Sequence, residues 1–140
     1  MPMRSRRIVV VAHCILNANA RYVGGARRPG AYTAVIEPYV LDGVGIVQLP
    51  CPESSFLGMD RPTMTRDQYD TAAYRQHCRE VLRPTVDTLE EFARGGYALE
   101  RVIGIKGSPS CGVTETTEGF RPTADEAGVA LTVIAIQGLF

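Results

Sequence analysis

The chain carries no net charge and contains no long hydrophobic run. Its 15 Lys and Arg residues balance 15 Asp and Glu residues, which argues against an electrostatic grip on nucleic acid or on an anionic membrane surface. No segment reaches the roughly 18 apolar residues that indicate a membrane-spanning helix. The N-terminus resembles a signal peptide only superficially, because His13 interrupts its apolar core and no small-residue cleavage site follows. We therefore expect a cytoplasmic protein that binds neither nucleic acid polymers nor membranes.

The chain also lacks two familiar sequence motifs. The chain has no CxxC pair, which is typical of structural zinc sites. It has no GxSxG motif, and His13 and His77 are its only histidines, so a serine hydrolase is disfavoured. What the chain does contain is four cysteines. In a cytoplasmic protein, cysteines indicate metal binding or catalysis before disulfides.

Continuous apolar segments, rich in β-branched residues, predict strands that are buried on both faces. These segments are residues 7–12, 44–49, 101–106 and 129–136. Helical patterns cover residues 31–41 and a long stretch from Thr65 to about residue 93. Strands that alternate with helices predict one α/β domain over residues 1–140, with a mainly parallel sheet and helices on both faces.

Finer features of the pattern add local expectations. Thr65 and Gln68 form a capping box at the start of the long helical stretch. Pro84 is expected to kink that stretch or to begin a second helix. The segment 51–65 is predicted to be a loop because Pro, Ser, Gly and Asp occur throughout, and 119–128 is predicted to be a loop or a short helix.

Three of the four cysteines follow predicted strands. Cys14, Cys51 and Cys111 each come within a few residues of a strand end, and the carboxyl ends of parallel strands share one edge of the sheet, where ligands bind. Cys78 instead falls inside the inward stripe of the long helix, so we expect a buried core thiol. Three converging thiolates need a compensating cation, which favours a metal centre over three unrelated buried thiols.

The identity of that metal stays open on spacing alone. Zinc held by three cysteines and a water is one possibility. An iron–sulfur cubane held by three cysteines is another, and it leaves one iron open to act as a Lewis acid. Polar residues flank the predicted site: Glu53 is a candidate general acid or base, and the Ser108 and Ser110 hydroxyls can donate to a substrate or to cluster sulfur. The arginines at positions 21, 27 and 28 are available to attract an anionic substrate.

Four motifs together resemble the TudS family of thiouracil desulfidases, and look closest to its TudS-related desulfidase branch. They are His13-Cys-Ile-Leu-Asn17, Pro50-Cys-Pro-Glu53, Gln68-Tyr-Asp70 and Lys106-Gly-Ser-Pro-Ser-Cys-Gly-Val113, which span most of the chain. The resemblance implies a Rossmann-like fold and a [4Fe-4S] cluster held by Cys14, Cys51 and Cys111. An aerobic preparation is expected to lose that cluster or to carry zinc in its place.

The implied reaction is the non-redox removal of sulfur, as sulfide, from a thiolated nucleobase or a related thioamide. The open iron takes the thiocarbonyl sulfur and water attacks the carbon. By motif position, Glu53 is the acid/base and Ser108 and Ser110 orient the base. Asn17 and Arg61 lie in segments that differ from the thiouracil branch, and we assign them to substrate binding.

Two other functions remain open. One is a non-catalytic iron–sulfur module for sensing or binding, and the other is a three-cysteine zinc protein. Whatever the function, the predicted sheet is small and leaves an edge for a partner to cover, so we expect a homodimer.

Overall fold

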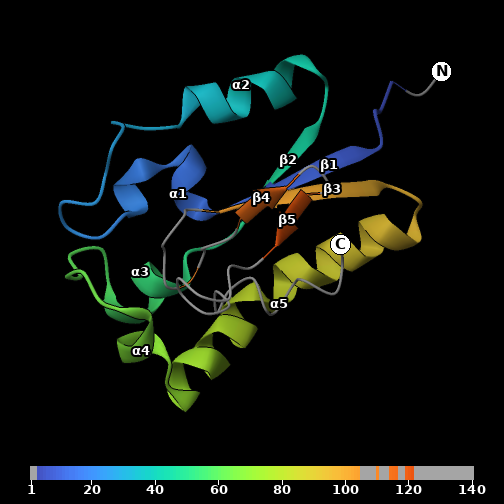
Figure 1. Ribbon diagram of the computed structural model, residues 1–140. Coiled ribbons are helices and arrows are strands. Elements are labelled where there is room, and N and C mark those ends of the chain that lie inside the picture. Colours follow the sequence, from blue (N-terminus) through green and yellow to red (C-terminus); the bar gives the residue numbers. More distant parts are fainter. Residues whose placement is uncertain (1–2, 105–109, 111–113, 117–118, 122–140) are drawn as a thin grey trace.

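A three-stranded parallel sheet forms the centre of the computed structural model, which describes residues 3–104, 110, 114–116 and 119–121. The strands are β1 (Arg7–Val11), β2 (Gly45–Gln48) and β3 (Ala98–Ile103), in the order β2-β1-β3 (Figure 1). Val11 of β1 pairs with Gln48 on one side and with Ile103 on the other. All three strands therefore end at the same edge of the sheet.

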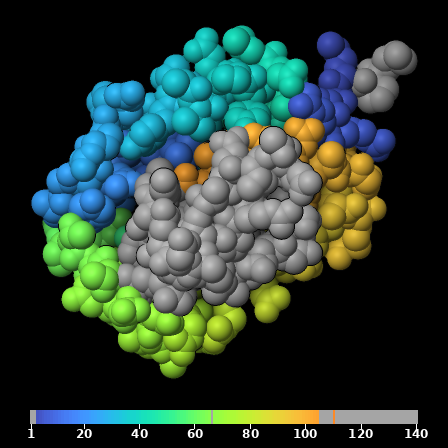
Figure 2. Space-filling view, in the orientation of Figure 1, coloured from blue at the N-terminus to red at the C-terminus, as the bar shows by residue number. Residues whose placement is uncertain are grey.

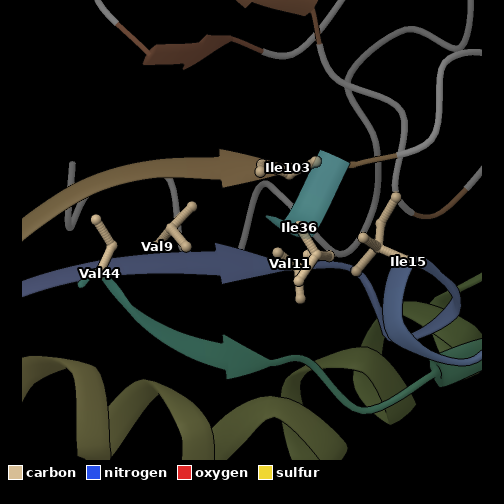
Figure 3. Packing of buried hydrophobic residues seen from close by; sticks show 7 residues of the cluster. Val9, Val11, Ile15, Ile36, Val44 and Ile103 are labelled. Atoms are coloured by element: carbon tan, nitrogen blue, oxygen red, sulfur yellow. The ribbon is translucent and has the colours of Figure 1, made fainter. Parts of the chain in front are cut away.

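Both faces of the sheet are covered because β1 alternates its buried side chains between them. On one face, Val9 and Val11 pack with Ile36 of α2 (Thr33–Leu41) and with Ile103 (Figure 3). On the other face, Val10 packs against Leu82 and Leu89 of α5 (Ala72–Arg94). This arrangement confirms the predicted α/β fold with helices on both faces, and Figure 2 shows the α2 and α5 layers on opposite sides of the molecule.

The remaining described elements are short. They are α1 (His13–Leu16), the 3-10 helix η1 (Ala18–Ala20), α3 (Pro52–Leu57), α4 (Arg66–Tyr69) and the antiparallel strands β4 (Thr114–Thr116) and β5 (Gly119–Arg121). Among the described residues, no helix is both long enough and apolar enough to cross a membrane.

The long helical stretch is divided rather than continuous. The Thr65 capping box is confirmed, because the Gln68 side chain accepts from the Thr65 amide and Thr65 Oγ1 accepts from the Gln68 amide. However, α4 ends at Tyr69, and Thr71 caps a new helix by accepting from the Tyr74 amide. Pro84 begins no second helix, since it lies inside the 23-residue α5. Cys78 is buried on the inward stripe, as predicted.

Two predicted loops were wrong in part. The segment 51–65 contains α3, because the Cys51 side chain caps the helix and Pro52 occupies its first turn, where proline is favoured. Residues 119–121 form strand β5, which is too short to show a period in the sequence. The third strand begins at Ala98 rather than at residue 101, with Glu100 bonded to Arg7 of β1. The strand predicted over 129–136 lies outside the described residues.

We predict that Leu82→Ala destabilises the protein strongly. Leu82 is fully buried between α5 and the sheet, so truncation leaves a cavity that costs about 2–5 kcal/mol in the free energy of unfolding. Urea unfolding measures this loss. The matched control is Leu41→Ala at the exposed end of α2, which should change the free energy by no more than about 0.5 kcal/mol. Equal effects of the two variants would contradict this packing.

Candidate functional site

Cys14 stands on a short helix directly after the central strand. The chain leaves β1 at Val11, and the Ala12 amide still bonds to the Ile103 carbonyl of β3 at 2.8 Å. The next residues turn into α1, whose Ile15 is buried in the core beside Ile36. That anchor leaves the Cys14 side chain half-buried at the edge where the strands end.

Cys51 occupies the equivalent place after β2. The Leu49 amide bonds to the Val11 carbonyl at 2.8 Å, which extends the parallel pairing beyond the strand. Cys51 then becomes the N-cap of α3, and its Sγ accepts from the Ser54 amide at 3.4 Å. The cysteine is half-buried. Its sulfur therefore has a fixed position at the start of a helix.

Two hydrogen bonds fasten the segments that carry these cysteines to each other. Nδ1 of His13 donates to the Leu49 carbonyl at 3.0 Å, and Nε2 of Gln48 donates to the His13 carbonyl at 2.8 Å. His13 precedes Cys14, and Leu49 precedes Cys51 by two positions. These two hydrogen bonds therefore hold the segment that carries Cys14 against the segment that carries Cys51.

The two thiols lie within electrostatic reach of each other. Burial raises the pKa of the Cys14 thiol, Arg21 counteracts this through its charge and a hydrogen bond, and the charge of Cys51 raises it further. Arg61 approaches the other sulfur, with 3.9 Å between its Nη2 and Sγ of Cys51. Each of these cysteines thus has an arginine beside it.

Glu53 forms a buried ion pair with Arg61 immediately next to Cys51. Arg61 Nε lies 3.2 Å from Glu53 Oε1, and the two residues are only 4% and 7% exposed. The other carboxylate oxygen accepts from the hydroxyl of Ser110 at 2.9 Å. The hydroxyl of Ser110 also lies 2.6 Å from that of Tyr74 on α5. The carboxylate is therefore held directly by Arg61 and Ser110, and Tyr74 in turn holds the Ser110 hydroxyl.

The guanidinium of Arg61 has further partners that fix it in place. Nη2 donates to the Ala20 carbonyl at 2.7 Å, and Nη1 donates to the Gly58 carbonyl at 3.4 Å. The Arg61 carbonyl accepts from the Val23 amide at 3.1 Å, so the segments around residues 20 and 60 adjoin (Figure 1). Burial, together with the negative charge of Glu53, raises the pKa of the neighbouring Tyr69 to about 12.

Comparison with known proteins identifies the family of this chain. The sequence profile described as 2-thiouracil desulfurase matches residues 9–139. The chain belongs to the 2-thiouracil desulfurase family. The name of the family suggests a desulfurase enzyme. An uncharacterized protein of Methanocaldococcus jannaschii, MJ0003, is 40% identical over 111 residues, which cover 79% of this chain and 70% of that protein. No solved structure matches the chain significantly.

The predicted site residues of this desulfurase family member fall into three groups. Cys14, Cys51, Glu53, Arg61 and Ser110 lie at or next to the sheet edge, joined by the contacts above. Asn17 is exposed, and its side chain accepts from the amide and the side chain of Asn19 at the start of η1. Ser108 and Cys111 lie outside the described residues, although Cys111 directly follows Ser110 in the sequence.

Tyr69 and Tyr74 belong to the site although the sequence assigned them no role. Both are buried, and Tyr74 contacts Tyr69 with 4.8 Å between ring centroids. Tyr69 sits in the Gln68-Tyr-Asp70 motif of the family resemblance, and Tyr74 stands four residues before Cys78 on the inward stripe. Extending that stripe by one helical turn identifies Tyr74 as an inward residue.

The cysteine chemistry of the site fits a thiolate-bound metal. In the described ranges no group of three or more metal-binding side chains gathers, but Cys111, the third expected ligand, lies outside them. The two described thiols are half-buried and close enough to interact, and each has an arginine nearby to offset thiolate charge. Hydrogen bonds to ligand sulfur are a usual outer shell of such centres.

We predict that Arg61→Met is strongly destabilising because it leaves the Glu53 carboxylate buried without its cation. The expected loss in the free energy of unfolding is about 3–5 kcal/mol. The double variant Glu53→Leu with Arg61→Met should recover most of that loss, because no uncompensated charge remains. Denaturant unfolding of the unaltered protein, of the single variants Glu53→Leu and Arg61→Met, and of the double variant gives the coupling free energy between the two residues.

The matched control is Arg94→Met, which breaks the exposed ion pair between Arg94 and Glu91 at the end of α5. An exposed pair contributes only about 0–1 kcal/mol. If Arg61→Met costs no more than Arg94→Met, the Glu53 carboxylate does not depend on Arg61.

Proposed function

We propose that this chain removes sulfur, as sulfide, from a thiolated nucleobase or a related thioamide without net oxidation or reduction. Membership of the 2-thiouracil desulfurase family supports the reaction class. The observation that carries the proposal is the grouping of Cys14 and Cys51, which follow neighbouring strand ends, beside the buried Glu53 carboxylate. Thiolates for a metal and a carboxylate for proton transfer are the two components that such a hydrolysis needs.

A [4Fe-4S] cluster held by Cys14, Cys51 and Cys111 is part of this proposal. When bound through three cysteines, such a cluster supplies one open iron, which acts as a Lewis acid toward the thiocarbonyl sulfur. His13 and Gln48 keep the first two ligands at a fixed separation. Arg21 and Arg61 place positive charge beside the same two sulfurs, which offsets part of the negative charge of the ligand set.

Glu53 is the proposed acid/base. A water molecule forms a bond from its oxygen to the substrate carbon, the C–S bond breaks, and the sulfur departs with the bonding electrons. Glu53 accepts one proton from that water and gives it to the departing sulfur, and the second proton of the water is released to solvent as the carbonyl forms, so that thioamide and water give amide, HS⁻ and H⁺. Oε1 faces Arg61 and Oε2 faces Ser110, but each carboxylate oxygen has a second acceptor position.

Arg61 and Ser110 are better suited to hold Glu53 than to contact the substrate. Arg61 is only 4% exposed and its guanidinium bonds to Glu53 and to two backbone carbonyls. Ser110 is 1% exposed and lies between Glu53 and Tyr74. We therefore assign both to positioning the carboxylate. Ser108 and the exposed Asn17 remain the proposed contacts to the base.

Anaerobic reconstitution with iron and sulfide tests the cofactor and the reaction separately. We expect a brown protein with cubane stoichiometry that releases sulfide from 2-thiouracil. Cys14→Ser should lose the iron, whereas Cys78→Ser should retain it, because Cys78 is buried on the inward stripe of α5 and does not follow a strand of the sheet. A protein that stays colourless after reconstitution and contains stoichiometric zinc would overturn the proposed cluster. Iron-loaded protein that releases no sulfide from any thioamide would indicate a binding or sensing module.

Glu53→Gln should reduce the rate of sulfide release by about 10²–10⁴-fold, since a positioned acid/base contributes that much. Iron content should stay at the level of the unaltered protein, because Glu53 is not a proposed ligand. Glu37→Gln is the matched control, since Glu37 is an exposed glutamate on α2. A Glu53→Gln protein that is folded, loaded with iron and fully active would remove Glu53 from the mechanism.

A further inference from the structure

The ring of Tyr74 is packed between aromatic rings at the start of α5, and the residue is only 1% exposed. The ring of Tyr69, which ends α4, lies 4.8 Å from it between centroids. The ring of Phe56 on α3 meets it edge-on at 5.2 Å. Aromatic pairs at such separations are favourable beyond the area that they bury. Because rings from two other helices hold the Tyr74 ring, packing determines where its hydroxyl group lies.

The helices that carry Glu53 and Tyr74 are also fastened to each other. The hydroxyl of Ser55 on α3 lies 2.8 Å from Nε2 of His77 on α5. The ring of Phe56 packs 5.0 Å from the ring of His77. Glu53 lies in the first turn of α3, and Tyr74 precedes His77 by three positions on α5. The carboxylate and the phenol therefore come from elements whose relative position is fixed.

Hydroxyl groups form a directional chain that ends on Glu53. The hydroxyl of Ser110 donates to Oε2 of Glu53 at 2.9 Å and lies 2.6 Å from the hydroxyl of Tyr74. A serine hydroxyl carries a single proton. Because that proton is used for the carboxylate, Ser110 must accept from Tyr74. The chain of donors therefore runs from Tyr74 through Ser110 to Glu53, and all three residues are buried.

This chain fixes a torsion angle that glutamate itself leaves loosely defined. The terminal torsion of a glutamate side chain has broad minima, so a carboxylate held at one oxygen can rotate about that contact. Arg61 binds Oε1, and Ser110 binds Oε2. Two backbone carbonyls hold the guanidinium of Arg61. Tyr74 gives the corresponding support to the Ser110 hydroxyl, because its proton determines which way that hydroxyl points.

We propose that Tyr74 is a positioning residue for the reaction: through Ser110 it fixes the rotation of the Glu53 carboxylate, so that the carboxylate meets the reacting water in one orientation. The inference rests on the proposed function, in which Glu53 is the acid/base. Tyr74 acts through Ser110 and contacts no substrate. A misaimed catalytic group slows the chemical step more than it weakens substrate binding. The contribution of Tyr74 is therefore to kcat rather than to KM.

Tyr74→Phe tests the role because it removes the hydroxyl and keeps the ring. In the reconstituted protein, kcat for sulfide release from 2-thiouracil should fall by roughly 10–100-fold. KM should stay within about twofold, since an interaction used in the chemical step is lost. Iron content should not change. Ser110→Ala breaks the same chain at its middle and should give the same loss. Unaltered kcat in a folded, iron-loaded Tyr74→Phe protein would overturn the proposal.

Tyr97→Phe is the matched control. It removes a tyrosine hydroxyl that accepts from Nη1 of Arg4 at 3.2 Å, just before β3 begins and so at the far end of that strand from the site. Its kcat should stay within about twofold of the unaltered protein, as expected for a surface substitution. A loss of kcat as large as that of Tyr74→Phe would mean that the effect does not depend on the chain to Glu53.

Combining variants shows whether Tyr74 acts through Ser110. Members of one hydrogen-bond network have effects that do not add. Tyr74→Phe should therefore change kcat by less than about twofold when it is introduced into Ser110→Ala or into Glu53→Gln. Losses that multiply in full would show that Tyr74 affects the rate by another route, which would overturn the chain. A general loss of structure would instead lower the iron content and the unfolding temperature.

The carboxyl carbon of Glu53 gives a readout that needs no reaction. In protein labelled with ¹³C-glutamate, the signal of Glu53 is the one that is missing from the spectrum of Glu53→Gln. Tyr74→Phe should shift this signal, whereas Tyr97→Phe should leave it in place. A signal that does not move in Tyr74→Phe would overturn the proposal. If the unaltered, reconstituted protein releases no sulfide, the proposed function fails, whereas the carboxyl signal still decides whether Tyr74 fixes the carboxylate.

Discussion

The buried ion pair between Glu53 and Arg61 is the contact on which the candidate site depends. Two opposite charges this deeply buried are stable only with good geometry and further hydrogen bonds. The protein supplies those bonds from the last residue of η1, from the end of α3 and from Ser110. Because the two charged groups need these partners, segments that are distant in the sequence lie together around the ion pair. Nη2 of Arg61 also lies 3.9 Å from the Cys51 sulfur, so the ion pair adjoins the cysteine.

The parallel sheet provides the second constraint. Since β1 is central and its last residue pairs with both neighbours, the segments after β1 and β2 must leave the sheet side by side. Hydrogen bonds from Ala12 and Leu49 continue the pairing past the strand ends. Short helices then begin at once, so that Cys14 and Cys51 are carried on rigid elements rather than on long loops. A rigid support of this kind keeps the geometry of a metal site precise.

The sequence was sufficient for the features that local patterns determine. Val9, Val10 and Val11 are buried on alternating faces, which is why an unbroken apolar run predicts a central parallel strand. The position of Cys14 and Cys51 after such strands predicts that they meet at one edge. The placement of Cys111 at the same edge remains a prediction, because this residue lies outside the described part of the chain.

Local patterns were insufficient where tertiary contacts decide. Pro52 and the serines that follow it are typical of a loop, yet the Cys51 side chain caps them into α3. Arg61 is assigned to substrate binding because its segment differs from the thiouracil branch, and the sequence gives no sign of its ion pair with Glu53, eight positions earlier. The contact between Ser110 and Tyr74 joins residues 36 positions apart. No periodicity in the sequence carries information about such a pair.

The double duty of the Cys51 sulfur affects how variants of this residue are interpreted. The sulfur is a proposed metal ligand and also the acceptor that begins α3, the helix that carries Glu53. Alanine at position 51 removes both roles together, whereas serine removes the thiolate but restores an oxygen that caps helices well. A loss of activity or stability found in the alanine variant but not in the serine variant would therefore come from the lost helix cap. A loss that both variants show would come from the missing sulfur.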